Sequence, residues 1–475
     1  MSPESLRDLL EREAADAPYV VVPPDTWRRG RRRRTFKRGG ALAASAVVVA
    51  GVALGARVLP GTDDRSLAPA GGGGDLGLPE HLHAPPERMS DIDLEFGGWV
   101  RDEVLRGDEL AVGTAAAAWV TPGGLPVVVD AETGEHHLLD LPDVVSADLE
   151  ARSFAGPHWS PLALSPDGTQ LAYGYMRIVD RGRRTSTGIR VLDLTTGEGA
   201  WRSELVGGAG IVVTELSWSR SGTWVGWQGR QTREWTGSSI GGSLPVAGVV
   251  GLDVTGGVAG VGGGGAVAAR DDAAAYTVEP GSIETLTACP PNARAGFGCS
   301  PTTRDWDSVG VDLAPGAALS PDGSTLALSV YDGYDLVTLR LDERRPTVGA
   351  EGMPDDRPWR VSSLGWVGDD HVLVLRSDNE GGDSILSIVP VDAGQGASTD
   401  VGTVDSAVGA PSIAIDLVTL DRPTVDRPDP DWPWSEERWA ITVAGAFVGV
   451  LLLLMLLLAR HASIRRPSRT QRPRR

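Results

Sequence analysis

Apolar residues alternate with polar or small residues in short runs, separated by turns, through most of residues 89–425. In the segment ALSPDGTQLAYGY (163–175), Leu171, Tyr173 and Tyr175 stand at every second position. Alternation with a period of two is typical of a β-strand, and small residues on the other face suit a strand packed between sheets. The pattern therefore predicts a series of strands joined by tight turns.

This segment is one copy of an internal repeat. It recurs as ALSPDGSTLALSV (318–330) and, in a weaker form, as SWSRSGTWVGWQ (217–228). In the SPDG tetrapeptide, Ser stands first, Pro presets φ at the second position and Gly stands fourth, which suits a type I turn. The repeat predicts that one hairpin is built several times. The turn residues that carry this prediction are Ser165, Pro166, Asp167, Gly168, Ser320, Pro321, Asp322 and Gly323.

A second marker, an apolar strand followed by Asp and a Gly-containing turn, occurs at six places, in weaker form at 276–281, where Glu replaces Asp, and without the Gly at 339–343. Its copies lie at 127–135, 191–198, 250–257, 276–281, 339–343 and 388–394. Turns of the first kind also fall at six places, about 46 to 54 residues apart, and a four-stranded propeller blade takes about 40 to 50 residues. We predict an all-β fold, a β-propeller of six blades with seven as the alternative. The alternating segment 412–420 is expected to close the ring by completing the first blade.

The two markers together resemble the TolB-type, WD40-like propeller repeats of bacterial envelope proteins. The resemblance extends over roughly 110–395, and it is weakest at 266–285, which has a Gly-rich lead-in and no SPDG turn. It implies a propeller and an interaction role, because such propellers commonly bind proteins or peptides. It does not imply one ligand, since propellers carry many functions.

Two apolar segments flank this region, and each is the length of a membrane span: 439–459 is uncharged, and 39–59 carries a single charge, Arg57. Basic clusters precede the first and follow the second, so the positive-inside rule places both termini in the cytoplasm. The predicted order is a cytoplasmic segment (1–38), a transmembrane helix or uncleaved signal anchor (39–59), a flexible linker (60–88), an extracytoplasmic propeller (89–425), a juxtamembrane stalk (426–438), a transmembrane helix (439–459) and a basic cytoplasmic tail (460–475). Residues 33–37 (RRTFK) also resemble a twin-arginine export signal, which leaves cleavage of the first segment as an alternative.

The composition agrees with this organisation. The 62 Gly and 33 Pro favour many turns. The net charge of −19 is unevenly spread, because residues 41–459 hold 27 basic and 57 acidic residues, a net charge of −30. Such a region repels nucleic acid and anionic lipid. We therefore expect a plasma-membrane protein whose partner is an unidentified protein, peptide or envelope ligand, and no nucleic acid.

The two cysteines, Cys289 and Cys299, lie in the Pro- and Gly-rich segment CPPNARAGFGC. An oxidising exterior favours a disulfide between them. Closing this loop would stabilise the fold by roughly 2 to 3 kcal/mol. The spacing excludes a CxxC redox pair.

One motif suggests catalysis. Residues 237–241 (GSSIG) match Gly-x-Ser-x-Gly, which would make Ser239 a nucleophile. That chemistry needs a strand before the serine and a helix after it. The residues after the motif start no helix, and His371 is the only later histidine of the domain, so we interpret the motif as a Gly/Ser loop and assign no catalytic residue.

The histidines and the clustered acids are the residue types that could ligate a metal. His81 and His83 stand on one side of an extended segment and could contact a metal, but no cluster of carboxylates or cysteines completes a site there, so we interpret the segment as a solvated linker. His136 and His137 point to opposite faces of a strand and cannot chelate one ion together. The acids Asp426, Asp429 and Asp431 are interpreted as part of a solvated stalk. No metal and no cofactor is assigned.

The sequence thus predicts a non-catalytic binding or scaffold module of the bacterial cell envelope. Two alternatives stay open. The N-terminal segment, with its short helix and Arg run, loosely resembles the cytoplasmic heads of membrane proteins that communicate with sigma factors, which suggests an anti-sigma-like regulator. An envelope hydrolase is the other.

Overall fold

The computed structural model describes most of one unit that begins at Gly74. The described ranges are 75–86, 104–122, 124–144, 161–179, 184–205, 210–235, 240–252, 258–260, 266–272, 274–279, 282–287, 302–305, 313–333, 335–342, 347–352, 359–378, 382–391 and 398–430. Two short 3₁₀ helices, Gly107–Leu110 and Ile415–Leu417, accompany 26 strands in these ranges. The expectation of an all-β fold is confirmed for this part of the chain.

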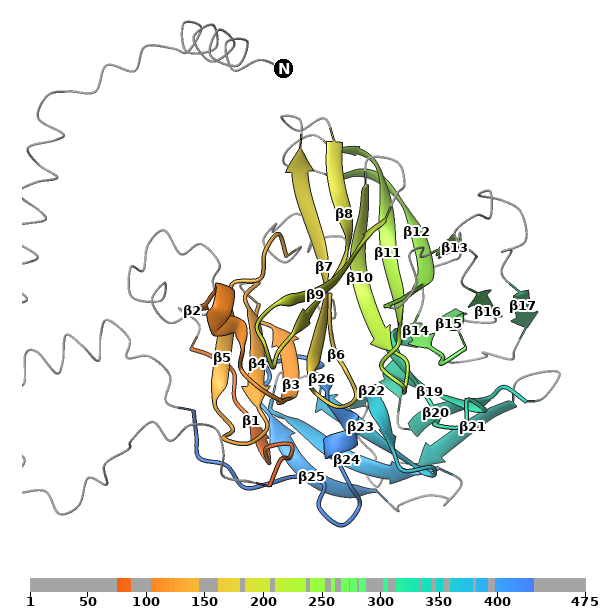
Figure 1. Cartoon of the computed structure of the whole chain (residues 1–475). Helices are drawn as coiled ribbons and strands as arrows, with labels where there is room; N and C mark the ends of the chain where they lie inside the picture. Colours follow the sequence, from red (N-terminus) through yellow and green to blue (C-terminus); the bar gives the residue numbers. More distant parts are fainter. Residues whose placement is uncertain are drawn as a thin grey trace, which may run out of the picture. The chain divides into compact units, whose positions relative to one another are not determined.

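The strands form six antiparallel groups of four, here called blades 1 to 6 (Figure 1). Blades 2, 3 and 4 are continuous in sequence. Blade 2 consists of β6 (Leu162–Leu164), β7 (Gln170–Val179), β8 (Arg184–Asp193) and β9 (Gly199–Leu205). Blade 3 consists of β10 (Gly210–Trp218), β11 (Trp224–Trp235), β12 (Ile240–Gly251) and β13 (Val258–Gly260). Blade 4 consists of β14 (Ala266–Ala269), β15 (Ala274–Glu279), β16 (Ser282–Thr287) and β17 (Thr302–Asp305).

Blades 5 and 6 share one hydrogen-bonded sheet, because β19 also pairs with β22 through Val330 and Val361. Blade 5 consists of β18 (Leu313–Leu319), β19 (Thr325–Gly333), β20 (Asp335–Arg340) and β21 (Thr347–Gly352). Blade 6 consists of β22 (Trp359–Val367), β23 (His371–Asp378), β24 (Ser384–Pro390) and β25 (Thr399–Val404), with β1 (His81–Leu82) added in parallel beside β25.

Blade 1 draws its strands from both ends of the unit. Its inner strand is β26 (Ser412–Ile413), which pairs with β3 (Ala115–Val120); β4 (Pro126–Asp130) and β5 (His136–Leu139) follow, and β2 (Val104–Leu105) lies parallel to β5. The closing strand predicted within 412–420 is therefore present, although it is short because a 3₁₀ turn begins at Ile415. The inner strands contact one another in the cycle β26, β6, β10, β14, β18, β22 and back to β26. Six four-stranded blades whose inner strands meet in a closed cycle define a β-propeller.

The hydrophobic core lies between neighbouring blades rather than in one central mass. One cluster joins blades 6 and 1, and others join blades 1 and 2, blades 2 and 3, and blades 4, 5 and 6. Tyr173 and Tyr175, which the alternation singled out, are both buried in the cluster between blades 1 and 2. The strands therefore alternate because each one packs against a neighbouring blade on both faces.

The segment predicted as a flexible linker, 60–88, differs from that expectation wherever it is described. Residues 75–86 belong to the folded unit, and Leu78 and Leu82 are completely buried beside blades 6 and 1. Burying each leucine contributes on the order of 2 kcal/mol. The many Gly and Pro residues around these leucines predict a linker, but contacts with residues distant in sequence form a strand there.

The predicted membrane segments, 39–59 and 439–459, lie outside the described ranges, as do the basic segments beside them. Among the residues that the structure does describe, no helix has the length and apolarity needed to cross a bilayer.

Candidate functional site: the central cavity

The six inner strands surround one cavity of about 450 Å³. Every blade contributes at least one inner-strand residue to its lining, among them Leu164, Leu216, Val267, Ala317, Ser363 and Ile413. A cavity of this size is in the range that small-molecule sites occupy. It is the candidate site because it is the place where all six blades converge.

The turns that join the first and second strands of blades 2 to 5 line the same cavity and form its mouth. Their charged lining residues are Arg220, Arg270, Asp271, Asp272 and Asp322. Pro166, Ser320, Pro321 and Gly323 of the two SPDG turns also belong to the lining. The repeated turns thus place polar and charged side chains at the mouth of the cavity.

Both arginines of the mouth are engaged in ion pairs. Arg220 lies 2.6 Å from Asp416, which stands in the 3₁₀ turn after β26, and both side chains are about two-fifths exposed. Arg270 lies 2.5 Å from Asp272 in its own turn. The positive charges are therefore neutralised locally, and the acidic groups that remain give the mouth a net negative charge.

The remaining acids are ionised at neutral pH. A hydrogen bond from the Ser320 hydroxyl is the main cause that lowers the pKa of Asp322, and Ser324 adds to it. Burial alone would raise the pKa of Asp271, but hydrogen bonds from Ser221 and Ser219 outweigh it, so the pKa is lowered. The mouth therefore favours a ligand that carries a positive charge.

The two SPDG turns have the same hydrogen-bond geometry. In the first, the Ser165 hydroxyl donates to Asp167 Oδ1 at 2.6 Å, and Ser165 Oγ accepts from Gln170 N at 2.9 Å. The Gly168 N–H closes the turn on the Ser165 carbonyl at 2.9 Å. The serine and aspartate thus satisfy backbone and side-chain groups within the turn itself, as short polar residues do in turns.

The second turn repeats these contacts with Ser320, Asp322 and Thr325 at 2.6 and 2.9 Å. The third copy, in blade 3, has Ser221 where the others have Asp, and Ser219 Oγ lies 3.2 Å from Ser221 Oγ. One turn design is therefore built with two different polar side chains at the same position.

Glu215 connects three blades at the cavity. It stands on β10 of blade 3, and its Oε1 accepts the N–H groups of Val267 in blade 4 and Gly316 in blade 5, each at 3.0 Å. Its Oε2 is buried and has no hydrogen-bond partner among the described residues. Burial raises the pKa of Glu215 to about 7. The carboxyl group therefore links inner strands of three blades by hydrogen bonds. Its ionised form is less favourable in this buried site than its protonated form.

Irregular strand pairing places these groups. The register between β10 and β11 shifts at Val213/Glu215, and that between β18 and β19 shifts between Leu313 and Ala317. Bulges of this kind re-aim side chains and backbone groups. Gly316 lies in the second irregularity at φ +105°, and a Cβ there would come within 2.8 Å of Ser329 Oγ, so glycine is required where the strand approaches Glu215.

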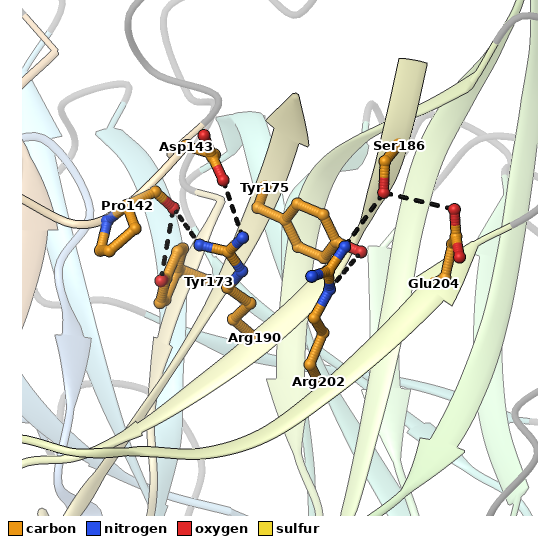
Figure 2. Close-up of polar contacts among 8 residues, drawn as sticks. All are labelled: Pro142, Asp143, Tyr173, Tyr175, Ser186, Arg190, Arg202 and Glu204. Carbon is orange, nitrogen blue, oxygen red and sulfur yellow. Dashed lines mark hydrogen bonds and ion pairs between the residues drawn. The ribbon is translucent and has the colours of Figure 1, made fainter. Parts of the chain in front are cut away.

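A second polar cluster lies on blade 2 (Figure 2). Arg190 Nη2 lies 2.7 Å from Asp143 Oδ2, and its Nη1 donates to the Pro142 carbonyl at 2.7 Å. Arg202 Nε donates to the Tyr175 hydroxyl at 3.0 Å. The cluster ties the segment that leaves blade 1 to strands β7, β8 and β9. It does not line the cavity.

Two of the predicted features lie outside the described ranges. These are the disulfide between Cys289 and Cys299, and the serine of the Gly-x-Ser-x-Gly motif, Ser239. Strand β12, Ile240–Gly251, comes directly after Ser239, where a nucleophile elbow needs a helix. The interpretation of the motif as a Gly/Ser loop stays a prediction, because Ser239 itself is not among the described residues.

The histidines are arranged differently from the expectation. His81 and His83 are not on a solvated linker, because β1 brings them to the seam between blades 6 and 1, where Asp405 lies 2.7 Å from His81 Nε2. His136 Nε2 accepts the backbone N–H of His83 at 3.4 Å. Burial lowers the pKa of His136 to about 4. The carboxylate that the sequence did not reveal is thus supplied from 324 residues away.

Sequence reasoning missed Glu215, Arg220 and Asp416. A signal for Glu215 was present, since it is the one ionisable residue in the otherwise apolar and small segment 210–218. Charged residues are rarely placed in a buried strand unless they are partnered. The pairing of Arg220 with Asp416 has no local signal, because it depends on how the ring closes.

No model of a known protein family matches this chain, and neither does any curated protein. Among solved structures, a hydrazine synthase of Kuenenia stuttgartiensis is similar, with a TM-score of 0.32 and 13% identity. The match covers 51% of this chain and 66% of the synthase chain, which is slightly less than two thirds of the synthase chain. TolB from Acinetobacter baumannii is similar with a TM-score of 0.31 and 16% identity, over 63% and 67% of the two chains. A putative TolB from Agrobacterium tumefaciens has a TM-score of 0.31 and 13% identity, over 63% and 88%. TolB, which the repeat motifs resemble, is therefore among the structural neighbours.

Proposed function

We propose that this chain is a membrane-anchored, extracytoplasmic β-propeller of the bacterial cell envelope, and that it binds the amino end of a peptide, without catalysis, in its central cavity. The observation that carries the proposal is the convergence of six inner strands on one cavity of about 450 Å³ with an acidic mouth. The cavity accepts a few residues of an extended chain, and the acids at its mouth attract an ammonium group.

The net negative charge of the cavity mouth indicates that the ligand carries a positive charge. Arg220 and Arg270 are paired within the protein, whereas Asp322 is held ionised by hydrogen bonds from its own turn. The 57 acidic residues of 41–459 against 27 basic residues add a long-range attraction for cations. A free amino end is the positively charged group that every unblocked peptide carries.

The test uses the full chain and a set of tripeptides, with free or acetylated amino ends, in equilibrium dialysis with mass-spectrometric detection. We expect peptides with free amino ends to be retained and their acetylated forms to be lost. Asp322→Asn should weaken retention because it removes the charge, while the amide oxygen can still accept from Ser320 Oγ and Ser324 N, as Asp322 Oδ1 does. Ser217→Phe should abolish retention by filling the cavity. A matched control, Thr303→Asn on the exposed strand β17, should leave retention unchanged.

Equal retention of acetylated peptides would refute recognition of the amino end. Retention that survives Ser217→Phe in a folded protein would refute the cavity as the site. Orientation in the membrane needs its own test. In intact cells, a membrane-impermeant maleimide should label Cys289 and Cys299 after mild reduction. Labelling only after lysis would place the propeller on the other side of the membrane.

A further inference from the structure

The seam between blades 6 and 1 gathers metal-binding side chains from opposite ends of the folded unit. His81 and His83 are alternate residues of the β1 segment and lie on the same side of it, while Leu82 between them is completely buried on the other side. Their imidazole rings stack, with centroids 3.9 Å apart and an angle of 18° between the ring planes. Two imidazoles are thus presented together on one face.

A carboxylate joins them from the other end of the unit. Asp405 directly follows β25, the strand with which β1 pairs. Its Oδ1 lies 2.7 Å from His81 Nε2, and its Oδ2 accepts the Ala84 N–H at 2.8 Å. The Asp405 N–H donates to the Leu82 carbonyl at 3.0 Å. Backbone pairing therefore fixes the side chains on both strands relative to each other.

The spacing suits an ion. One donor atom from each of His81, His83 and Asp405 lies within 4.8 Å of the other two. Ligand atoms placed about 2.0 to 2.2 Å from a tetrahedral zinc ion are roughly 3.5 Å apart, so rotation of the side chains is enough to bring the three donors onto one centre. The side chain of His81 is about two-fifths exposed and that of Asp405 about one third, which leaves an entry path for an ion.

A fourth donor lies nearby. Asp429 Oδ1 is 3.3 Å from His83 Nε2 and its side chain is almost fully exposed, so it is free to turn toward an ion. His136 plays a different part. Its Nδ1 lies 3.0 Å from the Gly134 carbonyl and its Nε2 accepts the His83 backbone N–H, so it positions the strand that carries the ligands.

From this arrangement we propose that His81, His83 and Asp405 bind a divalent first-row transition metal, Zn²⁺ in particular, with Asp429 or a water molecule completing a tetrahedral site. Two imidazole nitrogens and one carboxylate match zinc and its neighbours, whereas Ca²⁺ and Mg²⁺ prefer oxygen ligands alone. The ion would join β1 to the end of blade 6. Metal binding therefore stabilises ring closure, since it favours the folded chain in which the two strands are paired.

The test is titration of the full-length chain with ZnCl₂ after treatment with EDTA and dialysis. We expect one equivalent to bind and the thermal unfolding midpoint to rise. His83→Gln and Asp405→Asn should each weaken Zn²⁺ binding by about tenfold or more. The Asp405→Asn amide keeps an oxygen that accepts the Ala84 N–H, so this variant retains the strand pairing. Co²⁺ in place of Zn²⁺ should give visible absorption bands of a tetrahedral site, which both variants lose.

His137→Gln is the matched control, because His137 neighbours His136 in sequence but is not among the three candidate ligands. Its Zn²⁺ affinity should stay within about twofold of the unaltered chain, since no ligand is removed. No Zn²⁺ binding by the folded, unaltered chain overturns the proposal. Binding that is undiminished in both ligand variants, as judged by affinity and by the Co²⁺ spectrum, overturns it as well, since the ion then lies elsewhere on the chain.

Discussion

The guanidinium of Arg190 lies over the ring of Tyr175, with 4.5 Å between Arg190 Cζ and the ring centroid. Arg202 also stacks on this ring at 4.8 Å, so that Tyr175 lies between two cations (Figure 2). The tyrosine side chain is completely buried by these contacts and by the core between blades 1 and 2. A residue that the alternating pattern marks only as apolar thus also organises a polar cluster.

Two replacements of Tyr175 should separate the contribution of its ring to stability from the contribution of its hydroxyl. Tyr175→Phe removes only the acceptor for Arg202 Nε and should destabilise the fold by about 1 kcal/mol. Tyr175→Leu also removes both cation–π contacts and should destabilise it by roughly 2 to 3 kcal/mol. Urea unfolding of the two variants measures the difference. Equal losses would mean that the stacked guanidinium groups contribute nothing.

Two equivalent glycines offer a matched comparison of the repeated turns. Gly168 and Gly323 both have positive φ, +76° and +73°. A Cβ at Gly168 would lie 2.2 Å from the Ala115 carbonyl oxygen of blade 1, whereas a Cβ at Gly323 meets nothing within 4 Å. Both alanine variants lose about 1 kcal/mol through the unfavourable φ, but Gly168→Ala should lose at least about 2 kcal/mol more because the turn must move away from blade 1. Thermal unfolding of the two variants is the measurement, and similar midpoints would contradict the contact.

The buried carboxyl of Glu215 should make stability depend on pH. Its pKa is raised from 4.5 to about 7, so between these values the folded chain binds more protons than the unfolded chain. The free energy of unfolding attributable to Glu215 therefore falls as the pH rises through this window. Glu215→Gln should remove that slope and raise stability at pH 8 by on the order of 3 kcal/mol, because each unit of pKa shift corresponds to about 1.4 kcal/mol. Unfolding curves measured from pH 5 to pH 8 test this, and an unchanged slope in the variant would contradict it.

Two tryptophans join neighbouring blades in the same way. Trp218 Nε1 donates to the Ala163 carbonyl at 2.8 Å, between blades 3 and 2, and Trp366 Nε1 donates to the Ala318 carbonyl at 2.9 Å, between blades 6 and 5. Trp218→Phe and Trp366→Phe should each destabilise the fold by about 1 to 2 kcal/mol. Because the two sites share no partner, the double variant should show the sum of the losses. A loss well below the sum, measured by urea unfolding, would show that the two seams open together.

The sequence allowed the turns and the blade pattern to be predicted because their chemistry is local. Ser165, Asp167 and Gly168 satisfy one another within four residues, so the tetrapeptide alone is informative. The inner strand at 412–420 was recognisable from its alternation in the same way.

The rest depends on contacts between distant residues. Glu215 bonds to residues 52 and 101 positions away, and His81 meets Asp405 across 324 positions. Neither contact leaves a pattern in a short window. Strand β1 could not be predicted for the same reason, since only two buried leucines, Leu78 and Leu82, distinguish its segment from a Gly- and Pro-rich linker.

Ring closure also has a mechanical consequence. Pro79 and Val425 form a parallel bridge, in which the Val425 N–H donates to the Leu78 carbonyl at 2.7 Å and the Glu80 N–H donates to the Val425 carbonyl at 3.1 Å. Because the two segments run in the same direction, tension that draws the preceding chain and the following chain apart slides them along each other. The hydrogen bonds are then loaded in shear, all at once, and do not open one after another. The closure of the ring should therefore resist tension that is applied through the segments before Pro79 and after Val425.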